Sequence, residues 1–446
     1  MSGARDLFGF DQCIPRMARA VLESRPSADF SALRVVRDMH GRLYLVVPDD
    51  WPDDVLDVLR ARVSEALGPY SPGEANGVVR CSETLAGEAL FEEPSLVYWV
   101  GDVGVYVVER RAMGQDWVLR PEAGQEAHCP RFVFHSLKGG VGRTTAMMLW
   151  GRELVRRGRT VLLVDLDLEA PGLGAHMLSE QVRPEYGVVD WLVEDLVGNA
   201  GPALPPEMVA ESPLVDSPGL WVAPAVGRGA MAHPDNVMAK LARAYLEGED
   251  GSGFAARLQR MVAALESHVR PDVVLIDSRA GLHETVAASM LHLQAEVFLF
   301  AVDVPATWEG YHYLLAHLAL LASVRGEWSD AGDWRQRFHM VQARSSMSEA
   351  DRRRFAASAY SVWLDTLYDA LPPDATGSDE GWAFTFDERD PEAPHWPLSI
   401  LRSDHFEALV PLEQLAEVGE HAIGEAFGEF FEGLEATLRL LEEDDA

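Results

Sequence analysis

Ten consecutive residues, Ser136 to Thr145 (SLKGGVGRTT), place glycines, two cations and two hydroxyls at the spacing of a loop that binds phosphate. Such a loop normally reads G-x-x-x-x-G-K-[ST]. Its glycines let backbone N–H groups converge on the phosphates, its lysine reaches the outer phosphates, and its hydroxyl holds magnesium. In this chain Arg143 occupies the lysine position, and a second cation, Lys138, stands near the start of the loop. The residues predict a site for nucleotide phosphates that is altered at one critical position.

The flanking residues predict the strand and the helix that such a loop needs. Residues 131–137 (RFVFHSL) form a short, largely apolar run, and residues 144–157 (TTAMMLWGRELVRR) carry apolar side chains at helical spacing before Gly158, a natural helix stop. The first turn of that helix directs its N–H groups and the positive end of its dipole at the loop. Glycine-rich turns also join ordinary strands to helices, but cations and adjacent threonines on the motif's spacing favour a phosphate site.

The segment from Lys138 to Thr145 resembles the signature K-G-G-V-G-K-[ST]-[ST] of the deviant P-loop ATPases of the ParA/MinD type, as a KGGVGR variant. The resemblance covers most of residues 130–446. It implies that ATP and Mg²⁺ are the cofactors, and that Lys138 reaches across a nucleotide-sandwich homodimer to the partner's phosphates. The loop residues that it implies in ATP binding are Lys138, Gly139, Gly140, Val141, Gly142, Arg143, Thr144 and Thr145.

Two further segments end in acids where this family carries its carboxylates. Residues 160–165 (TVLLVD) lead into Asp165-Leu166-Asp167, which resembles the family's D-x-D, and residues 272–277 (DVVLID) lead into a Walker B-like D-[ST]-x-x-G. One such Asp alone would cap a turn, but three beside a phosphate loop favour a site. Magnesium on a triphosphate is steadied by one hydroxyl and one or two carboxylates, which predicts Thr144, Asp165 and Asp277 as its ligands. By resemblance, Asp167 orients or activates the attacking water. The expected catalytic residues are Lys138, Asp167 and Arg143.

Two positions depart from the family pattern. Arginine at position 143 keeps the positive charge and adds a bidentate fork, but its planar head is larger than an ammonium and not interchangeable with it. Hydrolysis that is retained, slowed or lost is compatible with this substitution. In relatives the segment after the sixth strand often supplies an Asn that reads adenine. Here that segment is Gln342-Ala343-Arg344, which leaves Gln342 as the candidate for base recognition.

The rest of residues 130–446 predicts a doubly wound α/β domain of about seven mostly parallel strands. Four more short apolar runs alternate with helical stretches, which is the pattern of such a sheet. Two segments rich in Pro, Gly, Asp and Glu, at 202–218 and 372–397, are expected to be functional loops or insertions. The additional strands are expected at 220–226, 296–302, 338–343 and 397–401, and the helices at 237–246, 254–269, 307–323 and 350–371.

Residues 1–129 predict a separate, smaller α+β domain without a nucleotide motif. Two apolar runs, 33–36 and 43–47, flank a turn and indicate a hairpin, and a helical stretch follows at 52–67. Two further strands are expected at 96–100 and 103–109. By exclusion, this module or the acidic loops are the expected contact for a protein partner.

Charge and hydropathy narrow the class of partner. The chain has 38 Lys and Arg against 71 Asp and Glu, for a net charge of −33, which disfavours nonspecific DNA binding. A local basic strip is expected to be solvated or paired. Residues 417–446 predict an acidic amphipathic helix that packs on its own domain, and such a helix does not suit a membrane surface. With no signal segment or spanning run, we expect a cytoplasmic protein. The strip consists of Arg143, Arg152, Arg156, Arg157 and Arg159.

The leading hypothesis from the sequence is a cytoplasmic Mg-ATP-dependent switch and ATPase. ATP bridges two subunits through Lys138, hydrolysis separates them, and the N-terminal module passes the state to a protein partner. The alternative is a scaffold or sensor that binds nucleotide and never turns it over. Such a scaffold could belong to a multi-protein defence or signalling system.

Overall fold

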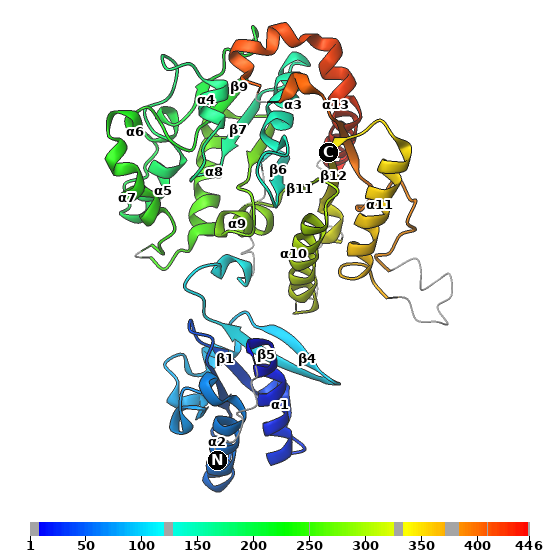
Figure 1. Ribbon diagram of the computed structural model, residues 1–446. Coiled ribbons are helices and arrows are strands. Elements are labelled where there is room, and N and C mark those ends of the chain that lie inside the picture. Colours follow the sequence, from blue (N-terminus) through cyan, green and yellow to red (C-terminus); the bar gives the residue numbers. More distant parts are fainter. Residues whose placement is uncertain are drawn as a thin grey trace, which may run out of the picture. The chain divides into compact units, whose positions relative to one another are not determined.

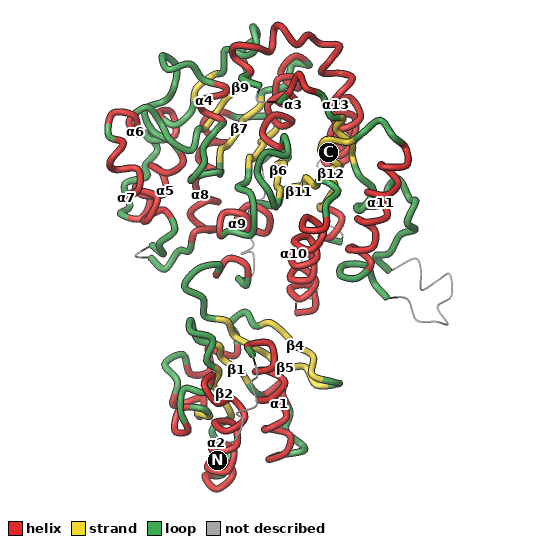
Figure 2. Tube along the Cα trace, in the orientation of Figure 1, coloured by secondary structure: helices red, strands yellow, loops and turns green. Residues whose placement is uncertain are grey.

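The computed structural model describes residues 9–119, 128–248, 250–324, 333–370, 383–407 and 409–444. The chain forms two compact units that divide near residue 120, and the end of helix α10 from His317 onward is grouped with the first unit. Figure 1 labels most of the helices and several of the strands, and Figure 2 distinguishes helices, strands and loops. Residues 372–382 of the expected loop at 372–397 lie outside the described residues.

The first unit contains a five-stranded mixed sheet in the order β3-β2-β1-β5-β4. β1 and β2 form the predicted antiparallel hairpin, β4 and β5 form a second one, and the remaining neighbours are parallel. The first hairpin turns at Gly41, whose φ of +82° suits glycine, and the Asp38 carboxylate accepts the N–H groups of His40 and Arg42. The elements are α1 (Cys13–Ser24), β1 (Arg34–Arg37), β2 (Leu43–Val47), α2 (Asp53–Leu67), β3 (Val78–Arg80), β4 (Leu96–Val100) and β5 (Val103–Glu109).

Helices α1 and α2 supply the main core of this unit. Their apolar side chains, such as Met17 and Leu59, are fully buried against one face of the sheet. A smaller cluster that includes Val36 and Leu90 covers the other face. The predicted α+β character of residues 1–129 agrees with this architecture.

The second unit contains an eight-stranded sheet in the order β13-β12-β11-β6-β10-β7-β9-β8. All neighbours are parallel except β8 and β9, so the predicted doubly wound α/β fold is confirmed. The expected seven strands are present. The eighth, β8, lies within the segment expected to be a loop at 202–218. The strands are β6 (Arg131–Ser136), β7 (Val161–Asp165), β8 (Ala210–Glu211), β9 (Leu220–Ala223), β10 (Val273–Asp277), β11 (Glu296–Ala301), β12 (Phe338–Ser345) and β13 (Leu398–Leu401).

Helices cover both faces of this sheet (Figure 1). The connection from β6 to β7 runs in the opposite direction along the sheet from the connection between β10 and β11, so right-handed crossovers place α3 and α9 on opposite faces. The reversal occurs at β6, and ligands of open α/β sheets bind at such a point. The helices are α3 (Arg143–Arg156), α4 (Leu173–Met177), α5 (Val188–Leu196), α6 (Gly229–Ala232), α7 (Val237–Ala244), α8 (Phe254–Val269), α9 (Glu284–His292), α10 (Pro305–Val324), α11 (Glu349–Leu364) and α13 (Pro411–Asp444).

Helix α13 packs on its own domain, as expected, and shares the core with α3. Phe430 is fully buried and its ring contacts those of Phe134 and Phe300, at centroid separations of 6.4 and 5.6 Å. The helix is kinked at Gly419, whose φ is +76°. Apolar residues of α3 such as Trp150 belong to the same cluster. The side chains of α13 buried in it are Leu415, Ile423, Ala426, Phe427, Phe430, Phe431, Leu434 and Leu438.

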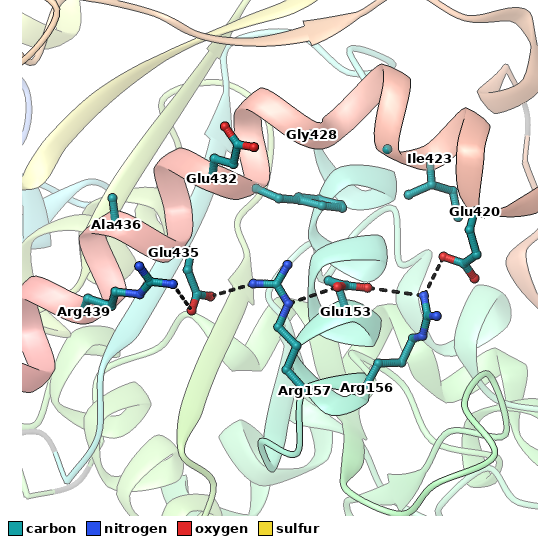
Figure 3. A pocket seen from close by; sticks show the side chains of 12 residues that line it. Glu153, Arg156, Arg157, Glu420, Ile423, Gly428, Glu432, Glu435, Ala436 and Arg439 are labelled. Carbon is teal, nitrogen blue, oxygen red and sulfur yellow. Dashed lines mark hydrogen bonds and ion pairs between the residues drawn. The ribbon is translucent and has the colours of Figure 1, made fainter.

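Acidic residues of α13 also pair with the basic strip at α3. Glu420 accepts from Arg152 and Arg156, each at 2.5 Å, and Glu435 lies 3.5 Å from Arg157 across a shallow groove between the helices (Figure 3). Arg159, just beyond α3, pairs with Glu442. These arginines of the strip are therefore paired, which is one of the two arrangements expected for them. Within the described residues, every helix is too short or too polar to span a bilayer.

Candidate functional site

The phosphate loop has the backbone that its sequence predicts. It joins β6 to α3 at the point where the strand order reverses, and Gly140 and Gly142 adopt φ values of +74° and +90°, which favour glycine. A Cβ atom added at Gly139, Gly140 or Gly142 would meet nothing within 4 Å, so the loop borders open space. In the described part of the chain, the N–H groups of residues 139–142 donate no backbone hydrogen bond. Together with the N-terminus of α3 they form a set of donors suited to phosphate oxygens.

The end of the loop is tied to the acids at the ends of β7 and β10. The Arg143 guanidinium is 7% exposed and donates from Nε to Asp277 Oδ1 at 2.6 Å. One terminal nitrogen donates to the Ser136 hydroxyl at 3.2 Å, and the other lies 3.5 Å from Asp167 Oδ2. All three nitrogens of the head group are thus engaged with the protein. The sequence predicted a cation at this position but not that the carboxylates would hold it.

The three residues predicted to hold magnesium lie together. The Thr144 hydroxyl donates to Asp277 Oδ2 at 2.6 Å, and Asp165 and Asp277 are register partners on the parallel strands β7 and β10. Asp165 is fully buried and accepts the N–H groups of Asp167 and Leu173, each at 3.1 Å. Magnesium on a triphosphate keeps waters and phosphate oxygens, so one hydroxyl and these two carboxylates fit its donor set. No cluster of three His, Cys, Asp or Glu at metal-binding spacing occurs among the described residues.

Burial controls the protonation of the acids. Burial, followed by the neighbouring Asp277 carboxylate, raises the pKa of Asp165 above its usual range. Burial also raises the pKa of Asp167, while the Arg143 charge opposes that shift. A carboxylate with a raised pKa is a better proton acceptor when ionised, which suits the role predicted for Asp167.

His135 lies in β6 next to the start of the loop. It is fully buried, and burial together with the Arg143 charge lowers its pKa to about 3, so the ring is neutral. Neither ring nitrogen has a hydrogen-bond partner among the described residues. His135 was not predictable as a site residue, because a histidine inside an apolar run carries no signal of its burial.

The other end of the loop is open. Lys138 is exposed, and its ammonium forms no hydrogen bond or ion pair with the described residues. Its carbonyl accepts the Ser136 hydroxyl at 3.0 Å. The structure thus leaves this cation available, whereas Arg143 is held within the protein.

The base-reading candidate and its neighbour differ in exposure. Gln342 is 4% exposed in β12, and its side-chain oxygen is buried without a partner among the described residues. Arg344, by contrast, is exposed, adopts a φ of +55° at an irregularity in the pairing of β12 with β13, and donates to the Gly140 carbonyl at 2.6 Å. Base recognition by Gln342 stays a prediction. The contact of Arg344 was not predictable, because no local sequence pattern indicates that an arginine adopts a left-handed backbone conformation.

No family model matches this chain, and no curated protein matches it in sequence. Solved structures that are similar include a variant of McdA from Cyanothece in complex with ATP, with 18% identity over 70% of this chain and 97% of that one and a TM-score of 0.41. The cell division ATPase MinD from Pyrococcus furiosus shows 19% identity over 69% of this chain and 99% of that one, with a TM-score of 0.39.

Cobyrinic acid a,c-diamide synthase from Mycobacterium smegmatis, with a bound ATP analog and magnesium, shows 23% identity over 44% of this chain and 69% of that one, with a TM-score of 0.32. Likenesses at this level carry no argument about function. The function proposed below therefore depends on the residues and geometry of this chain.

Proposed function

We propose that this chain is a cytoplasmic Mg-ATP-binding switch that hydrolyses ATP slowly and dimerises on nucleotide. The observation that carries the proposal is the geometry of the loop. Two left-handed glycines border open space, and the N–H groups of residues 139–142 donate no backbone hydrogen bond within the described residues. The helix N-terminus and a threonine–aspartate pair follow directly. Backbone donors of this kind bind phosphate, and the hydroxyl and carboxylates supply the oxygen ligands that magnesium prefers.

In this proposal Thr144, Asp165 and Asp277 hold magnesium, and residues 138–145 bind the phosphates. Magnesium supplies charge neutralisation and positions the phosphoryl group when it is bound. Asp167, at the exit of β7, orients the attacking water and accepts its proton. Lys138 supplies positive charge to the partner's phosphates, which fits its exposure and an ammonium that forms no hydrogen bond or ion pair within the described residues. The resemblance to ParA/MinD-type loops suggested this division of roles.

Arg143 supports slow hydrolysis over fast hydrolysis. Its guanidinium pairs with Asp277 and Asp167, so these carboxylates offset part of the charge that it would otherwise present to the phosphates. A cation that clamps the outer phosphates supplies much of the rate in phosphoryl transfer. We therefore place turnover below that of a chain with lysine at this position.

Phosphate release from Mg-ATP by the purified chain tests the proposal, with bound nucleotide quantified in the same samples. Asp167→Ala is expected to lower turnover about 10²- to 10⁴-fold without loss of bound nucleotide, since a proton acceptor contributes about that factor. Arg143→Lys is expected to raise turnover. A wild-type chain that binds no nucleotide at millimolar Mg-ATP would refute the proposal.

The engagement of Arg143 also favours a second candidate, a scaffold that binds nucleotide without turnover. Replacement of ATP by a non-hydrolysable analogue separates the two functions. A switch is expected to form a longer-lived dimer with the analogue, whereas a scaffold would show the same dimer lifetime with both. For either candidate, the first unit or the acidic loops remain the proposed contact for a protein partner, and the net charge of −33 disfavours nonspecific DNA binding.

A further inference from the structure

Arg279 is a second arginine fixed beside the phosphate loop. It lies two residues after Asp277, on a turn that is tied to β6 by two backbone hydrogen bonds. Ser278 N–H donates to the Phe134 carbonyl at 3.1 Å, and Gly281 N–H donates to the Ser136 carbonyl at 3.0 Å. The backbone of Arg279 is therefore held next to the first residues of the loop, whatever its side chain contacts.

The Arg279 side chain is held by an acid that it can leave. One terminal nitrogen lies 2.5 Å from Glu169 Oε1, and the Tyr245 hydroxyl donates to the same carboxylate oxygen at 3.3 Å. The Arg279 side chain is 27% exposed and that of Glu169 is 37% exposed. The Arg279 nitrogen in this pair is buried and makes no hydrogen bond among the described residues, so Glu169 holds it by charge alone, in a pair whose side chains are partly exposed and which is therefore weak. The long arginine side chain can therefore exchange Glu169 for a stronger anion.

Arg279 also lies at the same edge of the sheet as the acid that is proposed to orient water. Arg279 and Asp167 each follow by two residues one of the register partners Asp277 and Asp165. Asp167 is proposed to face the terminal phosphoryl group, and the proposed magnesium ligands lie at the ends of the same two strands, β7 and β10. Arg143 pairs with Asp277 and Asp167, whereas Arg279 forms no ion pair with either of these site carboxylates, so it is a further cation for that phosphoryl group beside magnesium and Lys138.

We propose that Arg279 contacts the terminal phosphoryl group of a bound nucleoside triphosphate, and that Glu169 holds it aside when that group is absent. The inference deepens the proposed function and rests on it. A guanidinium presents parallel N–H donors to phosphate oxygens, and such charge-assisted pairs are stronger than neutral ones. Arg279 thereby distinguishes triphosphate from diphosphate. Tyr245 immediately follows α7, so the release of Glu169 reaches that helix.

The test is the affinity of the full chain for Mg-ATP and for Mg-ADP, measured by isothermal titration calorimetry. Arg279→Ala is expected to lower the ATP affinity about 10- to 100-fold and leave the ADP affinity unchanged, because a charge-assisted contact to the lost group is removed. Arg279→Lys keeps the charge without the fork and is expected to lower ATP affinity only a few-fold. Glu169→Gln removes the competing carboxylate and is expected to raise ATP affinity.

Arg228→Ala is the matched control, because Arg228 forms an exposed pair with Glu185 at 2.6 Å in the same unit and lies outside the site. It is expected to leave both affinities unchanged. If Arg279→Ala lowers the affinities for ATP and ADP equally, or leaves the ratio of the two affinities unchanged, the inference is overturned and the proposed function stays intact. A wild-type chain that binds neither nucleotide would overturn both.

Discussion

At the start of the phosphate loop Lys138 is exposed and unpaired among the described residues, whereas at its end Arg143 is 7% exposed and surrounded by Asp277, Asp167 and Ser136. The two cations lie five residues apart on one loop, yet their environments assign them different tasks. A buried charge must be paired, so Arg143 contributes to the folded state and fixes the acids. A solvated cation costs little to move, so Lys138 is available to a ligand or a second subunit. The difference predicts that substitutions at the Arg143 end change mainly the stability of the fold, whereas substitutions at Lys138 change mainly the nucleotide-dependent behaviour.

Asp277→Ala is expected to have the largest effect on stability. The change leaves the Arg143 guanidinium buried without its closest partner, and removal of one member of a buried pair costs about 3–5 kcal/mol. The free energy of unfolding should fall by that amount in urea titrations followed by hydrogen exchange of the α3 amides. A double variant, Asp277→Ala with Arg143→Met, should recover much of the loss. A single variant as stable as wild type would show that water reaches Arg143.

His135 sharpens the comparison because the charge of Arg143, at the buried end of the loop, acts on its ring from the preceding strand β6. Its pKa is lowered to about 3 in the folded chain, so between pH 6.5 and 3 the unfolded chain binds the extra proton. Stability is therefore lost as the pH falls below about 6.5, by roughly 1.4 kcal/mol per unit. Between pH 7 and 5, wild type should lose about 2 kcal/mol more than His135→Gln in urea titrations of the second unit. Parallel pH profiles would show that His135 takes up its proton in the folded chain.

Glu420→Ala removes partly exposed pairs with Arg152 and Arg156 at the far side of α3. Exposed ion pairs contribute little, so the loss of unfolding free energy should be about 1 kcal/mol or less and should shrink at 1 M salt. The measurement is a urea titration at two salt concentrations. A loss as large as that of Asp277→Ala would mean that α13 supports the loop through these charges as strongly as the acids do.

Lys138→Ala is expected to have the smallest effect on stability, within about 0.5 kcal/mol, because the side chain is solvated. In the same samples, ATP-dependent dimer formation, measured by analytical ultracentrifugation, should be lost. Arg353→Ala, an exposed arginine on α11, is a suitable control for a change of surface charge. A destabilised Lys138→Ala variant would contradict the division of tasks between the two ends.

The site was predictable where local residue types dictate geometry. Glycines such as Gly140 and Gly142 indicate positions where the backbone can be left-handed. Acids that follow apolar strands meet at one edge of a parallel sheet, which predicted Asp165 and Asp277 beside Thr144. The partners of Arg143 were not predictable, because the reach of a long side chain depends on packing. Arg279 was not predicted as a site residue, because it occupies a variable position of the D-[ST]-x-x-G motif. Strand β8, with two residues and an antiparallel neighbour, left no periodic signal to detect.

Helix α13 places aromatic side chains in the core and acids on the basic strip. Both sets of contacts have a consequence for biosynthesis. Glu420 is 268 residues further along the chain than Arg152. At about 5–20 residues per second, a ribosome needs on the order of tens of seconds to connect the two. During that interval Phe134 of β6 and Phe300 of β11 lack their contact with Phe430, and such exposed apolar surfaces invite aggregation or chaperone binding. The loop therefore acquires its supported form only after the segment that contains α13 has left the ribosome.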